Sequence, residues 1–133
     1  YYGGKAMYWF IRLKTNNKVI GTIGLNAVDF KKRTASIGKG LSPKYWGKGI
    51  MFEAMWIMFK YCFTELDLET IITMTHIKNQ PNITMMKACG AIESSDKEII
   101  DSYNPPTGSV MLTLKKADVN YNRCLAFAKI GAV

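Results

Sequence analysis

The sequence is poor in the residues that build metal centres and disulfide frameworks. Its 133 residues include one histidine, His76, and three cysteines, Cys62, Cys89 and Cys124, which lie far apart and form no C-x-x-C pair. A zinc site needs three or four grouped ligands of these types, and a disulfide framework needs an even set of cysteines. We therefore expect no metal, and reduced thiols in a cytoplasmic protein.

Long apolar runs and blocks of like charge are also missing. No apolar stretch approaches the roughly 18 residues of a membrane-spanning helix, and no leader of basic then apolar residues opens the chain, so we expect no membrane partner. The formal charge is +8 at pH 7, which predicts an anionic partner. The basic residues are dispersed, apart from 31–33 and 115–116, and form no stripe that would follow a nucleic-acid backbone. A polyanionic cofactor is therefore favoured over nucleic acid.

The first half of the chain shows a clear order of predicted strands and helices, and its length fits one domain. Three β-rich segments joined by polar turns predict an antiparallel meander over 7–13, 19–28 and 34–41. Apolar residues then recur at helical spacing from Gly47 to about Leu66, and residues 69–77 alternate as a strand does. This succession predicts a βαβ unit.

The second half predicts a short helix and a closing hairpin. Asn79 and Pro81 suit a helix start, and Gly90 suits its end. Segments 92–102 and 109–115 predict two further strands, whereas 121–133 is a modestly apolar tail without a clear element. The expected fold class is α/β (α+β), with one domain over 1–120 and a C-terminal tail over 121–133. We expect three apolar tail residues to pack on the same chain or on a neighbour: Leu125, Phe127 and Ile130.

The segment from Lys44 to Gly49, K-Y-W-G-K-G, lies between a predicted strand and the long predicted helix. Two glycines one residue apart allow tight backbone curvature, and the amides at a helix N-terminus can bind a phosphate. An ordinary turn has the same pattern. The segment is neither a Walker A loop nor a dinucleotide fingerprint.

Two separate motifs resemble the GNAT acetyltransferase superfamily. Residues 44–49 are similar to its acetyl-CoA signature Q/R-x-x-G-x-G/A, and 37–55 resembles the branch that includes ribosomal-protein N-terminal acetyltransferases. Downstream, 79–91 resembles the family pattern N-x-x-S-x-x-x-x-x-K-x-G-F, with the same spacing from Asn to Gly. Upstream, 9–12 and 20–25 resemble its W-x-I and I-G-x-I-x-L strands, so the resemblance covers Met7 to Lys115.

The resemblance implies a mixed sheet in which the third meander strand and the next parallel strand splay apart around acetyl-CoA. It implies cofactor-binding residues in three groups: Ile37, Gly38, Lys39, Gly40 and Leu41 beside the pantetheine; Lys44, Trp46, Gly47, Lys48, Gly49 and Ile50 around the pyrophosphate; and Asn79 and Asn82 at the next helix. The implied activity is N-acetylation of a primary amine, in a protein N-terminus, an amino acid or a small molecule. The alternatives are a catalytically silent acyl-CoA sensor or scaffold, and a basic nucleic-acid module.

Three positions depart from the family pattern, namely Ser36 for glutamate, Asn82 for serine and Lys44 for glutamine or arginine. The resemblance therefore names no catalytic acid or base. His76 is the one side chain whose ordinary pKa suits a general base, with Tyr103 and Glu53 as further candidates. The family's acceptor pocket is built from a strand and two helices for which this chain shows no counterpart, so we expect the tail or the partner in a homodimer to complete the fold.

Overall fold

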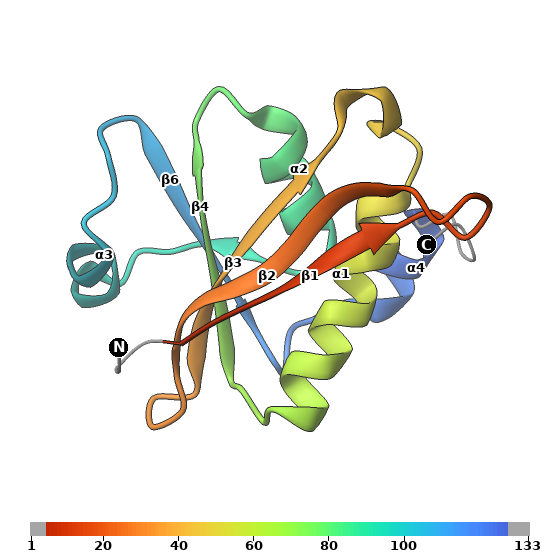
Figure 1. The fold of residues 1–133 in the computed structure, drawn as a ribbon. Coiled ribbons are helices and arrows are strands. Elements are labelled where there is room, and N and C mark those ends of the chain that lie inside the picture. Colours follow the sequence, from red (N-terminus) through yellow and green to blue (C-terminus); the bar gives the residue numbers. More distant parts are fainter. Residues whose placement is uncertain (1–4, 128–133) are drawn as a thin grey trace.

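The structure, a computed structural model, describes residues 5–127. Its described strands form one mixed sheet in the order β1-β2-β3-β4-β6-β5 (Figure 1). The strands are β1 (Lys5–Arg12), β2 (Val19–Asp29), β3 (Thr34–Leu41), β4 (Thr70–His76), β5 (Ile92–Glu93) and β6 (Ser109–Lys115). The helices are α1 (Ile50–Lys60), α2 (Gln80–Ala88), α3 (Lys97–Tyr103) and α4 (Tyr121–Phe127).

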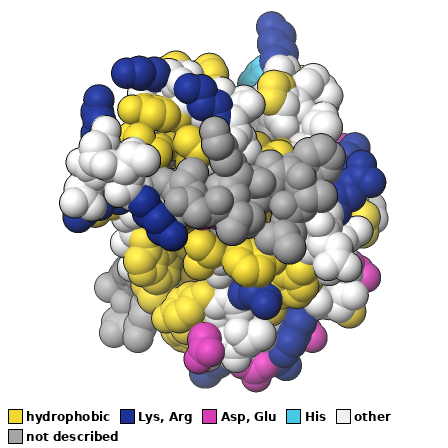
Figure 2. Space-filling view, turned by 90° about the vertical axis from the view of Figure 1, so that its right-hand side faces the viewer, with side chains coloured by type: hydrophobic (Ala, Val, Ile, Leu, Met, Phe, Trp, Pro, Cys, Tyr) yellow, Lys and Arg dark blue, Asp and Glu magenta, His cyan; other side chains and the backbone are white. Residues whose placement is uncertain are grey.

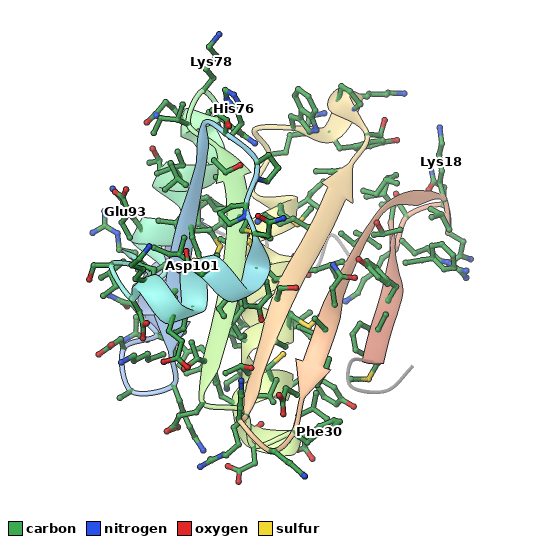
Figure 3. All side chains as sticks on the ribbon, turned by 90° about the vertical axis from the view of Figure 1, so that its left-hand side faces the viewer. Lys18, Phe30, His76, Lys78, Glu93 and Asp101 are labelled. Carbon is green, nitrogen blue, oxygen red and sulfur yellow. The ribbon has the colours of Figure 1, made fainter. Side chains whose placement is uncertain are left out.

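The helices form two layers on the sheet. Helices α1, α2 and α4 pack on one face, and α3 lies across the opposite face (Figures 1 and 3). The main core lies between the sheet and the first of these layers, where Met55 and Phe59 of α1 meet Leu25 of β2 and Leu112 of β6, all fully buried. Each such side chain contributes about 1.5–3 kcal/mol of burial free energy, so this layer fixes the strands that carry the candidate site.

The predicted meander is confirmed, and its glycines serve close strand contact. A Cβ at Gly21 would lie 2.3 Å from the carbonyl oxygen of Gly40, and one at Gly24 would lie 2.4 Å from that of Met7. The irregularity in the β2–β3 ladder lies between Asn26 and Asp29, not at a glycine. Ala27, with φ at +48°, takes up this change of register.

The predicted βαβ unit is confirmed, with different helix ends. Strand β3 pairs in parallel with β4, and α1 connects them. The helix begins at Ile50 rather than at Gly47, because Gly47 and Gly49 both have positive φ, at +74° and +79°. Beyond Lys60 the helix continues as a π-helical turn over Tyr61–Glu65, which accounts for the predicted end near Leu66.

The strand predicted over 92–102 is wrong. Only Ile92 and Glu93 pair with β6, and residues from Lys97 onward form α3. Asp96 nucleates this helix, since its carboxylate accepts hydrogen bonds from the Glu98 and Ile99 amides at 3.0 and 3.3 Å. The closing hairpin is therefore reduced to two residue pairs.

Residues 121–127 of the predicted tail form a helix on the core. Helix α4 packs against α1, and its Cys124 is fully buried. The side chains of Leu125 and Phe127, and all of Ile130, lie outside the described part of the chain. Across residues 5–127, every helix is too short or too polar to cross a membrane.

Candidate functional site

Strands β3 and β4 run together at one end and diverge at the other (Figure 3). Their three residue pairs end at Ser36–Ile72. Beyond it, β3 stays paired with β2 up to Leu41, and β4 stays paired with β6 up to His76. The inner edges of both strands are therefore unpaired within the described sheet, so β3 offers backbone N–H and C=O groups from Ile37 to Leu41 to an extended ligand, apart from the Leu41 carbonyl, which accepts from Trp46.

The glycine loop closes the wide end of this opening. Its left-handed glycines turn the chain from β3 into α1, and Gly49 is the N-cap of the helix. Since glycine has no side chain, Gly49 offers the first-turn amides no side-chain acceptor, and only its backbone carbonyl accepts, from the Glu53 amide at 3.2 Å. Trp46 fastens the loop to β3, because its indole N–H donates to the Leu41 carbonyl at 2.7 Å. The loop therefore presents a helix N-terminus, with its positive dipole end, beside the diverging strands.

Positive charge gathers at this loop. The ammonium groups of Lys44 and Lys48 each lie 5.8 Å from the centre of the Tyr45 ring. On the face of the molecule shown in Figure 2, by contrast, Lys and Arg side chains are spread out and form no single stripe. The loop therefore brings two lysine ammonium groups to the wide end of the opening, where they would attract an anion.

Lys39 adds a partly buried cation inside the opening. Lys39 lies two residues from both Ile37 and Leu41 on β3 and so shares their face of the sheet. Its side chain therefore faces the helix layer, where the Cys89 thiol acts on it electrostatically. Burial lowers the pKa of Lys39 from 10.5 to about 8. A phosphate in the opening would favour the charged form and reverse this shift.

The start of α2 forms the other wall. Asn79 caps this helix, since its Oδ1 accepts from the Asn82 amide at 3.4 Å. The side-chain oxygen of Asn82 is buried and accepts no hydrogen bond from any described residue. An orphaned buried acceptor costs about 1–3 kcal/mol, and an amide N–H of a bound ligand would satisfy it. The opening, the loop and this oxygen together fit an extended, amide-containing phosphate ester such as coenzyme A.

The three candidate proton-transfer residues lie in different places. His76 is at the tip of β4 (Figure 3), where its Nδ1 accepts a hydrogen bond from the Lys78 amide at 3.1 Å. Its ring faces Gly108, on the β6 side of β4. Burial raises the pKa of Tyr103, whose side chain hydrogen-bonds Thr34 at the paired end of β3. Glu53 is 4% exposed in the first turn of α1. Thus none of the three stands at the point where the strands part.

A row of three polar residues, of which the sequence singled out only Ser36, does stand at that point. On the face opposite α1, the Tyr8 hydroxyl donates to Asn26 Oδ1 at 2.6 Å, and the Ser36 hydroxyl donates to the Asn26 carbonyl at 3.2 Å. The three residues come from three neighbouring strands. Their proximity depends on strand register, which no local sequence pattern specifies.

A separate apolar cavity of about 430 Å³ lies between β1 and α1, lined by residues that include Trp9, Ile57 and Tyr61. It is separated from the opening by β2. It therefore lies apart from the glycine loop.

The fold agrees with solved structures of acetyltransferases. The spermidine N-acetyltransferase of Vibrio cholerae, solved in complex with CoA and spermine, superposes with a TM-score of 0.72 at 18% identity, covering 88% of this chain and 68% of that one. At this level of identity the likeness shows the fold alone.

Proteins similar in sequence are also named as acetyltransferases. The uncharacterized N-acetyltransferase p20 of Bacillus licheniformis is 35% identical over 85 residues, which are 64% of this chain and 48% of that protein. The FsC-acetyl coenzyme A-N(2)-transacetylase of Aspergillus fumigatus is 29% identical over 98 residues, 73% of this chain and 39% of that protein. The chain thus spans about half the length, or less, of these curated relatives.

The family profile of the acetyltransferase (GNAT) domain matches residues 2–92. This match includes the meander, the glycine loop and both walls of the opening. It extends over more than half of the sequence, and the chain belongs to the GNAT acetyltransferase family.

Proposed function

We propose that the protein is an N-acetyltransferase that moves an acetyl group from acetyl-CoA to a primary amine. The observation that carries the proposal is the divergence of β3 and β4 beside a glycine loop at a helix N-terminus. A parallel strand pair that opens after three residues offers unpaired backbone to an extended ligand, and the loop offers an anion site at its end. The family and its relatives support the same reading.

Each wall of the opening has a part in binding. Backbone groups from Ile37 to Leu41 would pair with the pantetheine, and the loop amides with Lys44 and Lys48 would hold the pyrophosphate. Asn82 Oδ1 would accept from a pantetheine amide. Acetyl-CoA supplies the activated thioester. The chain's own contribution is to hold that thioester at the apex near Ser36, where proximity alone lowers the barrier.

The general base stays a prediction. His76 is the only histidine, but the lone pair of its Nδ1 is engaged by Lys78. A neutral imidazole has one free lone pair, so His76 acts as a base only if this hydrogen bond breaks. Water relaying the proton from the amine is the simpler route.

Acceptor class and cellular context are also part of the proposal. The acceptor is a protein N-terminus, an amino acid or a small-molecule amine, and the Vibrio relative solved with spermine is an example of the last class. Three free, buried cysteines favour the reducing cytoplasm. A homodimer stays a prediction. Light scattering would test it, and the candidate surface is the outer edge of β1, which pairs with no strand among residues 5–127.

Calorimetric titration with acetyl-CoA, with ATP and NAD as controls, tests the cofactor site. We expect selective micromolar binding. Release of the CoA thiol is then followed with a free-N-terminus peptide, an amino acid and spermidine. Turnover with one amine supports the transferase. Binding without turnover on any of the three supports the second candidate function, a silent acyl-CoA sensor, which the departures at Ser36 and Asn82 favour. Absence of binding by the folded protein contradicts both.

A further inference from the structure

The side chain of Tyr8 lies flat across two neighbouring strands at the front of the opening. A Cβ on Gly24 would lie 2.4 Å from Tyr8 Cδ1, and one on Gly38 would lie 2.8 Å from the Tyr8 hydroxyl. Both distances are shorter than van der Waals contact. The absence of side chains at Gly24 and Gly38 therefore leaves space for the tyrosine ring, which extends from β1 across β2 to β3.

The hydroxyl has a fixed orientation. It donates its hydrogen to Asn26 Oδ1 at 2.6 Å, and the Asn26 amide nitrogen lies 3.0 Å from the position of a Cβ on Gly38. Because a phenol has one hydrogen, an oxygen that donates to Asn26 has only lone pairs left to offer. It can accept from an N–H group, whereas it cannot donate a proton to a leaving thiolate without first breaking the bond to Asn26.

The hydroxyl lies where a reacting amine would arrive. Gly38 is the second residue beyond Ser36, at which pairing between β3 and β4 ends. The helix side of the sheet is filled by the main core, to which Ile37 and Met55 belong. On the front side, Tyr8 is 51% exposed. An amine therefore reaches the opening from the front, past the phenol oxygen.

We propose that Tyr8 positions the acceptor amine, with its oxygen accepting one amine N–H while Asn26 holds the phenol in place; this inference rests on the proposed transferase function. One N–H bonded to Tyr8 directs the nitrogen lone pair at the thioester carbonyl. The C–N bond forms as the C–S bond breaks, the sulfur leaves as the thiolate and takes a proton from water, and the nitrogen gives a proton to water. Tyr8 is a positioning residue and changes its protonation at no point.

The test uses n-propylamine as acceptor, because it has no polar group besides the reacting amine. For Tyr8→Phe we expect the KM for n-propylamine to rise about tenfold, the loss typical of one hydrogen bond. We expect kcat to change less than threefold, since the bond forms in the ground state as well as in the transition state. Calorimetry should give the same Kd for acetyl-CoA. Tyr61→Phe, on the opposite face of the sheet, is the matched control and should leave all three constants unchanged.

A second variant displaces the phenol without removing it. Gly38→Ala places a methyl group against the hydroxyl, so it should raise the same KM. Because both changes act on one contact, the double variant should be no worse than Tyr8→Phe alone.

Three results overturn the proposal. An unchanged KM in Tyr8→Phe removes the contact with the amine. A fall of kcat at unchanged KM makes Tyr8 a proton donor instead. If the increases in KM of the two single variants multiply in the double variant, then Tyr8 and Gly38 act independently. In each case the wild type still turns over, so the transferase function survives. A wild type that binds acetyl-CoA but acetylates no amine overturns both proposals together.

Discussion

Replacing Gly49 by aspartate would test the anion site with one carboxylate. Residue 49 caps α1 with φ at +79°, a conformation that asparagine and aspartate tolerate better than other non-glycine residues. A carboxylate there would itself accept hydrogen bonds from the first-turn amides and would repel a phosphate. Gly49→Asn has nearly the same shape and no charge, so the difference between the two variants isolates the electrostatic effect.

The expected magnitude follows from the hydrogen bonds at stake. Each amide bonded to a charged oxygen contributes about 1.5–3 kcal/mol, and every 1.4 kcal/mol changes Kd by about tenfold. Loss of two such bonds therefore weakens acetyl-CoA binding by about 100-fold or more in Gly49→Asp relative to Gly49→Asn.

Calorimetry on both variants measures this difference, after thermal melts have shown that both are folded. The core side of α1 does not involve residue 49, so we expect similar melting temperatures. Affinities within threefold of each other would refute the assignment of the pyrophosphate to this loop. Equal and large losses in both variants would point to backbone strain instead of charge.

Two further changes test the ion pairs of Asp67 and the role of His76. Lys116 and Arg33 hold the pKa of Asp67 in the folded protein below its usual value. The ion pairs therefore stabilise the fold fully at a pH above the pKa of Asp67 in the unfolded chain, and this stabilisation is lost as the pH falls through the pKa of Asp67 in the folded protein. Thermal melts of Asp67→Asn should show a lower Tm than the wild type at pH 7 and the same Tm near pH 2; an equal difference at both would exclude the ion pairs. Because Nδ1 is engaged by Lys78, His76→Ala should lower kcat less than tenfold at unchanged acetyl-CoA affinity, whereas a 100-fold loss would identify His76 as the base.

The elements that sequence predicts well are those with strong local signals. The meander, α1 and α2 follow from alternation, helical spacing, and the Asn79 cap with Gly90 as the stop. Helix α3 was missed because its apolar pair Ile99–Ile100 suits either a strand or a helix. Only the Asp96 cap decides between them.

The sequence predicts residues for the proposed cofactor side of the site, whereas it predicts none of those proposed for the acceptor side. The loop and the α2 start are contiguous motifs, so a family resemblance locates them. Tyr8, Asn26 and Gly38 come together only through the register of three strands, where a slip by one residue would send each side chain to the other face. Nothing in the sequence marks Tyr8 as different from the other tyrosines.

The divergence of β3 and β4 also divides the sheet mechanically. The meander β1–β2–β3 forms one unit and the β4–β6 pair forms another, and they share three residue pairs and the Arg33–Asp67 contact at a single end. Because the strands of the two units pair with each other at one end only, we expect local opening of the sheet to be easier at the free end than at the paired end, although α1 packs on both units. Amide hydrogens of Ile37–Leu41 that face the gap should therefore exchange with solvent long before those of the Thr34–Ser36 segment, and a ligand that bridges the two units would slow that exchange.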